Sequence, residues 1–283
     1  MDNNRNIPPK KKKPLNTLLL VLLAAAICLC IAVVCIYFSG TRYISMATAD
    51  GGTVKYFGKV DKNGDLFSGK LYYSDGITAD VNGAEGIIRY SNGDVYKGDI
   101  ENLGKSGTGS IVYANGDKYE GEFLNNTLEG KGTMTYANGD TYEGEFKGGL
   151  KSGIGKYVWS DGSVYEGSFV NDRKNGHGKH TWPNGTVYDG DYVDDLREGS
   201  GTYVFPNGDK YTGEFKADVR SGNGVYTWAN GEIYEGEFLN NKMHGKGTYT
   251  WPSGRTYSGI FENGVIVRAE ETEGIDPSVE PEK

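Results

Sequence analysis

The residues of this chain that could bind a metal are few and poorly placed for it. His177 and His180 form an H-x-x-H pair, and a shared metal would need both imidazoles on one side of the chain. Because residues three apart on a β-strand point to opposite faces, this pair cannot share an ion. Residues 61–65 begin like a calcium loop, but Leu66 stands where such a loop needs glycine. We therefore predict no metal site.

Carboxylates recur as Glu-x-Glu pairs, for example Glu120 and Glu122, on the polar face of the predicted strands. Such a stripe could collect divalent cations weakly, but a solvated face that discourages aggregation is the simpler interpretation. The Gly-x-Gly pairs lie within predicted strands and not before a helix, so they are not phosphate cradles. No nucleophile, base and orienting group occur together. We predict that the chain is not an enzyme and uses no cofactor.

Aromatic side chains offer the remaining binding chemistry. Tyrosine and tryptophan cover much area with few rotatable bonds. Four tryptophans occupy one position of a repeat, at the predicted edge of the sheet, where they could stack on sugar rings or pack between repeats. They are the candidate binding-face residues: Trp159, Trp182, Trp228 and Trp251.

These residues are placed by a repeat with a period of 23 residues. Gly-x-Gly pairs, and an aromatic residue three positions before a glycine, keep the same period. A fixed period of this size is typical of stacked supersecondary units. The clearest marker is a Tyr-x-Gly pair that returns without an insertion at Tyr96/Gly98, Tyr119/Gly121, Tyr142/Gly144, Tyr165/Gly167, Tyr188/Gly190, Tyr211/Gly213, Tyr234/Gly236 and Tyr257/Gly259.

Each unit has the pattern of a β-hairpin. Period-two alternation puts Tyr119, Gly121 and Phe123 on one face and the neighbouring glutamates on the other. Asn138-Gly139 then predicts a tight turn. Glycine inside a strand is costly unless another group approaches the backbone closely. We expect that group to be an aromatic ring from the neighbouring hairpin.

The whole pattern resembles the MORN repeat, the membrane occupation and recognition nexus family. The resemblance rests on Tyr-x-Gly-x-Phe, a loop, Gly-x-Gly-Thr-x-x-aromatic and Asn-Gly-Asp-x-Tyr, and it covers residues 86–262 approximately. It implies an all-β repeat fold, an elongated single-layer antiparallel sheet of stacked 23-residue hairpins. It also implies roles in membrane apposition, lipid contact or protein scaffolding.

The N-terminal segment predicts one transmembrane α-helix before the repeats. Leu18 to Phe38 are 21 residues without a charge, which matches the ~20 residues that span a bilayer. The alternative is a secretory signal cleaved after Ala49, but such signals have a shorter apolar region. Lys10 to Lys13 precede the span, so the positive-inside rule puts the N-terminus in the cytoplasm and the repeats outside.

Charge and composition divide the chain further. Residues 1–49 carry a net charge of +5 out of the total of −8, which leaves −13 on the remainder. The three cysteines all lie in the apolar run, so the body has no disulfide framework. The predicted segments are a basic cytoplasmic tail (1–14), a signal-anchor helix (15–39), a tether (40–50), an irregular N-terminal cap (51–85), the repeat array (86–267) and an acidic tail (268–283).

The sequence therefore predicts a non-enzymatic scaffold or binding module, anchored in the cell membrane, exposed outside it and bacterial in type. A protein partner is the leading expectation, because an exposed sheet can bind peptides by groove or edge. Cell-wall glycan is the alternative, with the tryptophans stacking on sugars. Lipid headgroups are a further alternative, although a body of −13 should be repelled by anionic lipid. No nucleic-acid partner is expected.

Overall fold

The computed structural model describes residues 26–31, 33–34, 37, 39–48 and 51–269, of which 26–31, 33–34 and 37 are helical. The described residues form 21 strands that pair in antiparallel fashion. In chain order they are β1 (Thr41–Ala47), β2 (Thr53–Val60), β3 (Leu66–Tyr73), β4 (Thr78–Asn82), β5 (Ile87–Tyr90), β6 (Val95–Glu101), β7 (Gly104–Val112), β8 (Lys118–Leu124), β9 (Thr127–Thr135), β10 (Thr141–Lys147), β11 (Leu150–Val158), β12 (Val164–Val170), β13 (Arg173–Thr181), β14 (Val187–Val193), β15 (Leu196–Val204), β16 (Lys210–Lys216), β17 (Val219–Thr227), β18 (Ile233–Leu239), β19 (Lys242–Thr250), β20 (Thr256–Glu262) and β21 (Val265–Ala269).

The chain divides into two compact units, which are described separately. The first contains Met1–Asn92 and Ile100–Leu103, and the second contains Gly93–Asp99 and Gly104–Lys283. The sequence placed the start of the array at residue 86. The division falls later because β5 pairs with β4 through Ile87 to Tyr90 and so belongs to the first unit.

The predicted membrane span, Leu18–Phe38, lies mostly outside the described residues, as does the basic tail 1–14. In the part of the chain that the structure describes, no helix combines the length and the apolar character that crossing a bilayer requires. The acidic tail also lies outside the described residues, apart from its first two positions, which end β21.

The first unit is more regular than the sequence suggested. Residues 41–47, predicted as part of a tether, form β1 and pair along their whole length with β2. The predicted irregular cap supplies β2 to β4, also paired in sequence order. Tyr56 is fully buried and its hydroxyl donates to the carbonyl of Lys59. Since Tyr56 also covers Gly58 and Gly69, the β2–β3 hairpin packs as the array hairpins do.

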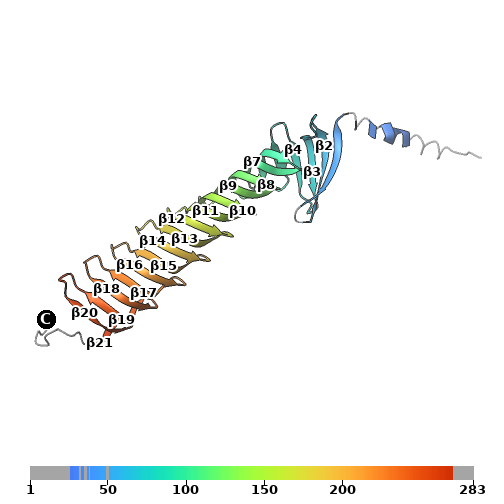
Figure 1. Ribbon diagram of the computed structural model, residues 1–283. Helices are drawn as coiled ribbons and strands as arrows, with labels where there is room; N and C mark the ends of the chain where they lie inside the picture. Colours follow the sequence, from blue (N-terminus) through green and yellow to red (C-terminus); the bar gives the residue numbers. More distant parts are fainter. Residues whose placement is uncertain (1–25, 32, 35–36, 38, 49–50, 270–283) are drawn as a thin grey trace, which may run out of the picture. The chain divides into compact units, whose positions relative to one another are not determined.

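The second unit is a row of hairpins in one layer, β7 to β21, each strand paired with the next along the chain (Figure 1). Strands of seven and nine residues alternate from β8 to β20. The turns alternate too. Asn125 and Asn126 both have positive φ (48° and 72°), which suits the two-residue turn of a twisted hairpin, while Gly139 (φ 92°) closes the other turn. β21 pairs with β20 at the end of the row.

One face of the array forms its core from tyrosines and glycines. Tyr119 is buried, and its hydroxyl donates to the carbonyl of Glu122, three residues along the same strand. The ring therefore lies flat over Gly121 and over Gly132 of the paired strand, so a Cβ added to either would meet the Tyr119 hydroxyl at 2.4 to 2.5 Å. The prediction that this ring comes from a neighbouring hairpin was wrong. Because residues i and i+2 of a strand share a face, Tyr119 covers Gly121 of its own strand.

The same correction applies to the later repeats. A Cβ added to Gly190, Gly213 or Gly236 would lie 2.6 Å from the hydroxyl of the tyrosine two positions earlier in its own strand. The row ends at Gly259, which is buried on β20 and pairs with Gly247 of β19. Gly190, Gly213 and Gly236 therefore also accommodate a ring of their own strand, and not one from the neighbouring hairpin as the sequence suggested.

Neighbouring hairpins contribute ring edges instead. Tyr119 meets Phe123 of its own strand and Phe146 of the next repeat, with ring centroids 5.2 and 5.1 Å apart and planes near perpendicular. Edge-to-face geometry of this kind is favourable for aromatic pairs. The contact repeats from Tyr96 to Phe261 without a break. One tyrosine and one aromatic partner per repeat thus give a single-layer sheet its core.

Candidate binding surfaces of the repeat array

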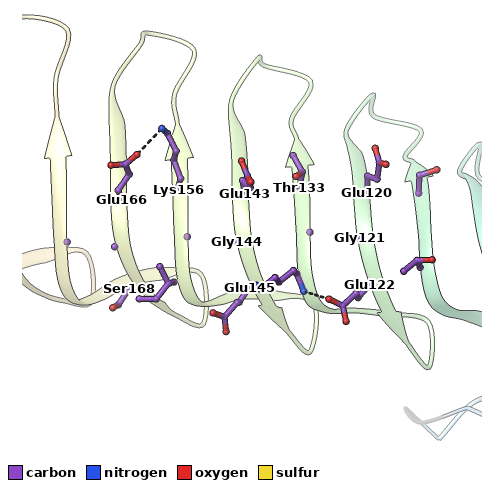
Figure 2. A pocket seen from close by; sticks show the side chains of 18 of the residues that line it. Glu120, Gly121, Glu122, Thr133, Glu143, Gly144, Glu145, Lys156, Glu166 and Ser168 are labelled. Carbon is purple, nitrogen blue, oxygen red and sulfur yellow. Dashed lines mark hydrogen bonds and ion pairs between the residues drawn. The ribbon is translucent and has the colours of Figure 1, made fainter.

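The opposite face of the array carries a groove of about 1590 Å³ that crosses nine strands, β6 to β14. Its floor is the bare backbone of paired glycines such as Gly121 and Gly132, whose Tyr119 ring lies on the other side of the sheet. Its walls are the side chains immediately before and after each glycine, such as Glu120 and Glu122 (Figure 2). Nine strands spaced about 4.8 Å apart give it a length of roughly 38 Å.

The eight Tyr-x-Gly repeats are not equivalent on this face, although the sequence predicted one common role for their glycines. The floor of the groove includes Gly98, Gly121, Gly144 and Gly167. The four later glycines do not line it: Gly190, Gly213, Gly236 and Gly259. In the β15–β16 pair that follows, the residues in the wall position are Thr202 and Thr212, whose hydroxyls lie 3.1 Å apart. The groove ends before this pair, at Asp189 of β14.

The walls carry both signs of charge. Four lysines and six carboxylates line the groove, together with His177 and several hydroxyls. Lys156 and Glu166 form an ion pair across neighbouring strands at 2.8 Å (Figure 2). A surface that carries both positive and negative charge does not favour binding of a polyanion. It favours a partner that presents both acidic and basic groups.

The two glutamates of each Glu-Gly-Glu segment have different roles, which the sequence did not separate. A β-bulge shifts the register after Gly121, and Gly130 takes positive φ (61°) there. The backbone N–H of Lys131 then donates to the Glu122 carboxylate at 2.9 Å (Figure 2). Asp99, Glu214 and Glu237 accept the equivalent bond in their own repeats. Glu122 therefore caps the backbone as well as lining the groove, whereas Glu120 is an exposed residue of the groove wall.

The two histidines occupy opposite faces, as predicted. His177 is exposed in the groove, with Nε2 3.0 Å from Asp189 and Nδ1 3.5 Å from Asp191. His180 is buried on the aromatic face, where burial lowers its pKa to about 4. Its Nε2 finds no hydrogen-bond partner among the described residues. Those residues also contain no cluster of three or more His, Cys, Asp or Glu side chains that could hold a metal.

The four candidate tryptophans belong to a second line of rings that runs along the aromatic face. Every ring is within 6.2 Å of the next, measured between centroids. In order, the line contains Tyr136, Tyr157, Trp159, His180, Trp182, Tyr203, Phe205, Tyr226, Trp228, Tyr249 and Trp251. We call this line the aromatic ladder.

Packing within the ladder engages the indole rings. His180 stacks between Trp159 and Trp182, at 4.9 and 3.9 Å with interplanar angles of 18° and 22°. Trp228 has Tyr226 on one side and Tyr249 on the other, at 4.6 and 5.3 Å. A sugar needs an open ring face to stack on. The half-buried tryptophans therefore serve inter-repeat packing first.

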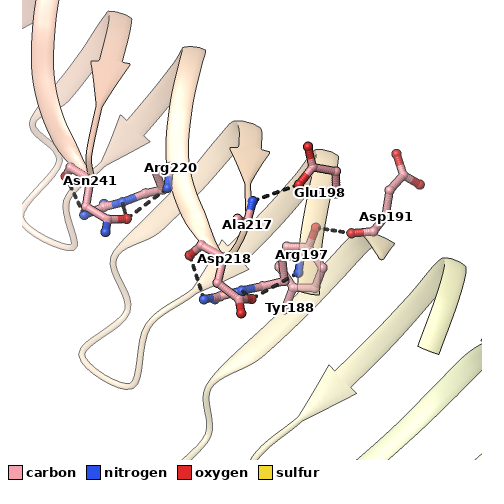
Figure 3. Close-up of polar contacts among 8 residues, drawn as sticks. All are labelled: Tyr188, Asp191, Arg197, Glu198, Ala217, Asp218, Arg220 and Asn241. Atoms are coloured by element: carbon pink, nitrogen blue, oxygen red, sulfur yellow. Dashed lines mark hydrogen bonds and ion pairs between the residues drawn. The ribbon is translucent and has the colours of Figure 1, made fainter. Parts of the chain in front are cut away.

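Cations lie between the core tyrosines and the ladder. Arg197 packs over the rings of Tyr188, Tyr203 and Phe215 at 5.1 to 5.7 Å, and its Nε donates to Asp218 at 2.8 Å (Figure 3). Such contacts stabilise a cation that is partly withdrawn from water. Lys151, Lys174 and Arg220 occupy the same position in other repeats. Arg220 differs because Asn241 replaces the aspartate as its partner (Figure 3).

Sequence reasoning missed the cation row and half of the ladder. The missed ladder residues stand two positions before the aromatic residue that precedes the turn glycine of each repeat. They are Tyr157, His180, Tyr203, Tyr226 and Tyr249. Period-two alternation alone would have put them on the same face as that marker. The cations recur every 23 residues from Lys151 to Arg220. The pattern was not recognised because the position holds Lys in two repeats and Arg in two others.

The fold and its groove define an all-β protein of stacked hairpins, open-ended and built from a short repeat. Six consecutive MORN repeats are present, at residues 119–141, 142–164, 165–187, 188–210, 211–233 and 234–254. MORN repeat proteins are generally non-enzymatic modules. No curated protein is significantly similar in sequence to this chain.

Solved structures share only a general likeness. The SAS-4 TCP domain of Drosophila melanogaster, solved with a proline-rich motif of Ana2, is 18% identical over 54% of this chain and 83% of its own, with a TM-score of 0.35. The TCP10c domain of Drosophila Sas-4 is 14% identical over 68% and 98%, with a TM-score of 0.28. Virginiamycin B lyase from Staphylococcus aureus is 9% identical over 79% and 85%, with a TM-score of 0.16. Scores this low carry no argument about function.

Proposed function

We propose that this chain is a non-enzymatic, single-pass membrane protein that displays its MORN repeats outside the cytoplasmic membrane and binds a protein partner in the glycine-floored groove. The observation that carries the proposal is the groove itself, about 1590 Å³ of open space over backbone that has no side chain to fill it. A scaffold needs such a surface, and the other face of the same strands is taken up by its own rings.

The dimensions of the groove favour an extended segment of the partner. Wall residues two apart on one strand, such as Glu120 and Glu122, are separated by about 7 Å. An α-helix with its side chains is about 10–12 Å wide and would not enter. A single extended chain would fit, and roughly 38 Å holds about eleven residues at 3.4 Å each. Mixed charge on the walls selects a segment that carries both signs.

The groove is tested by filling it. Thr133 is exposed on the groove wall, and Thr202 has the same repeat position three repeats further along, outside the groove. Thr133→Trp should abolish capture of the partner from a membrane extract, while Thr202→Trp should retain it. Equal capture by both variants would contradict a groove site.

The membrane anchor rests on the sequence of Leu18–Phe38, which has the length and apolar character of a span. Carbonate extraction tests it, because an integral protein stays in the membrane pellet at high pH. The wild-type chain should pellet, and Leu22→Arg with Leu23→Arg should release it, whereas Thr17→Arg at the flank should not. Release of the wild type would exclude the anchor.

Cell-wall glycan and lipid headgroups are the alternative ligands. Glycan binding would use Trp159, Trp182, Trp228 and Trp251. His180 stacks on Trp159 and Trp182, so these two would offer mainly their edges. Trp228 and Trp251 have tilted ring contacts, and the Arg255 guanidinium lies 5.2 Å from the Trp251 ring centroid. Incubation of the full chain with insoluble wall polymer separates these ideas. Pelleting that Trp251→Ala abolishes and Thr133→Trp leaves intact would favour the glycan over the protein partner.

A further inference from the structure

The first unit has an exposed face whose composition differs from that of the array. Seven side chains on the outer face of β1 to β5 are aromatic or basic, and together they form what we call the basic aromatic face: Tyr43, Lys55, Phe57, Lys59, Lys70, Tyr72 and Arg89. Tyr43, Phe57 and Tyr72 are 63%, 48% and 44% exposed. Large aromatic residues so exposed on one sheet face mark an interaction surface.

Strand register brings these residues together. Tyr43 lies opposite Phe57, and Phe57 lies opposite Lys70. In the adjacent row, Lys55 lies opposite Tyr72. On the other side, β2 to β5 bury Val54, Tyr56, Leu71, Ala79, Val81 and Ile88, while Ile44 and Met46 of β1 are half-buried. The basic aromatic face is therefore one continuous surface, made by alternate residues of a sheet whose reverse carries the buried core of the first unit.

The charge of this face opposes the charge of the array. Among the described residues of β1 to β5 that lie opposite the residues of the basic aromatic face, Asp80 is the one carboxylate. It forms an ion pair with Lys70 at 3.4 Å. The other described carboxylates of β1 to β5 lie in turns between strands, at Asp61, Asp65, Asp75 and Glu85. The chain from residue 93 onward has a net charge of −12. Positive charge with exposed aromatic rings is thus concentrated in one place.

That place is next to the predicted membrane span. The span ends at Phe38 and β1 begins at Thr41, so at most about 11 Å of extended chain separates them. The connection is also held by contacts, since the Arg42 guanidinium donates to the carbonyl of Tyr37 at 3.0 Å and packs 4.5 Å from its ring centroid. A sheet held this close to a bilayer has headgroups within reach.

We propose that the basic aromatic face binds the surface of an anionic membrane. This inference rests on the proposed anchor. Lysines are attracted to anionic headgroups, and tyrosine and phenylalanine rings lodge at the headgroup level. Contact at two points, the span and this face, fixes how the first unit meets the bilayer. Lipid recognition then belongs to the sheet before the MORN repeats, not to the acidic repeats.

The test uses the full chain in nanodiscs, with Cys28, Cys30 and Cys35 replaced by alanine. A polarity-sensitive dye is attached at Ser45→Cys, beside Lys55 on the face. Its emission should shift to shorter wavelength in discs of phosphatidylcholine with phosphatidylglycerol, and not in phosphatidylcholine alone. High salt should reduce the shift, because it screens surface charge. The same dye at Thr133→Cys should show no shift.

Charge reversal supplies the matched control. Lys55→Glu, Lys59→Glu and Lys70→Glu together should abolish the shift. Lys131→Glu, Lys156→Glu and Lys179→Glu change the net charge equally on the array and should leave it intact. A chain that enters nanodiscs without an anionic shift, or shifts equally in both lipids, overturns this inference alone. A chain that does not co-purify with nanodiscs overturns the anchor as well.

Discussion

Strand β8 shows how differently the two faces of the array use alternate residues. On one face, Tyr119 and Phe123 are buried against rings of the neighbouring repeats. On the other face, Glu120 and Glu122 border a groove that no side chain fills. Gly121 serves both faces, since a ring lies on one side of it and open space on the other. A single-layer sheet can therefore be stable and still offer bare backbone to a partner.

The largest expected loss of stability comes from adding a side chain at Gly144, beneath the ring of Tyr142. A Cβ on Gly144 would lie 2.5 Å from the Tyr142 hydroxyl and 2.6 Å from the Cα of Gly155. Gly144→Val should therefore cost about 3 kcal/mol of overpacking. Thermal unfolding should show a fall in Tm on the order of 10 °C.

The control is Glu143→Gln, one residue away on the groove face, where the side chain is exposed. It should shift the Tm by less than about 2 °C, since exposed substitutions cost within roughly 0.5 kcal/mol. Similar losses for the two variants would break the distinction between the faces.

A smaller effect should depend on pH and come from the ladder. Burial lowers the pKa of His180 to about 4, below the ordinary value of 6.5, so the fold favours the neutral imidazole. The unfolded chain then binds more protons between these values, and stability should fall as the pH drops from about 6.5 to about 4. The loss should be at most about 3 kcal/mol.

The matching variant is His180→Tyr, because the other repeats have tyrosine at this position: Tyr157, Tyr203, Tyr226 and Tyr249. Urea unfolding across this pH range should show a flatter stability profile for the variant. The reverse change, Tyr203→His, should steepen the profile. An unchanged slope in both variants would mean that the ladder does not bury its histidine.

The smallest effect should separate the two glutamates of one segment. Glu122→Ala leaves the N–H of Lys131 without its acceptor at the bulge, which should cost about 1 kcal/mol. Glu120→Ala should be nearly neutral. Chemical denaturation of the two variants compares them directly, and a larger loss for Glu120→Ala would overturn the assignment of the cap.

The sequence predicted the hairpins and their faces because the period of 23 residues repeats without an insertion. It could not predict the bulge, because Gly130 shows its positive φ only in the paired strands. The groove was missed for a related reason: a glycine in the sequence does not say which side of the sheet stays open. β1 was missed because its pairing with β2 leaves no periodic signature.

The extent of the groove was also beyond the sequence. Gly167 lines the groove and Gly190 does not, although both stand in the same Tyr-x-Gly marker. Enclosure depends on the side chains that flank each glycine on neighbouring strands, and these vary from repeat to repeat while the marker stays constant. A repeat pattern therefore predicts the shared core better than the surface that a partner would meet.

The claim that a partner occupies the glycine-floored groove is tested most directly by photo-crosslinking from two positions. A photoreactive residue at Thr133 samples the groove, and one at Trp251 samples the end of the aromatic ladder. The account predicts that the captured partner crosslinks at 133 and not at 251. Crosslinking at 251 alone would contradict it and move the binding site to the tryptophans.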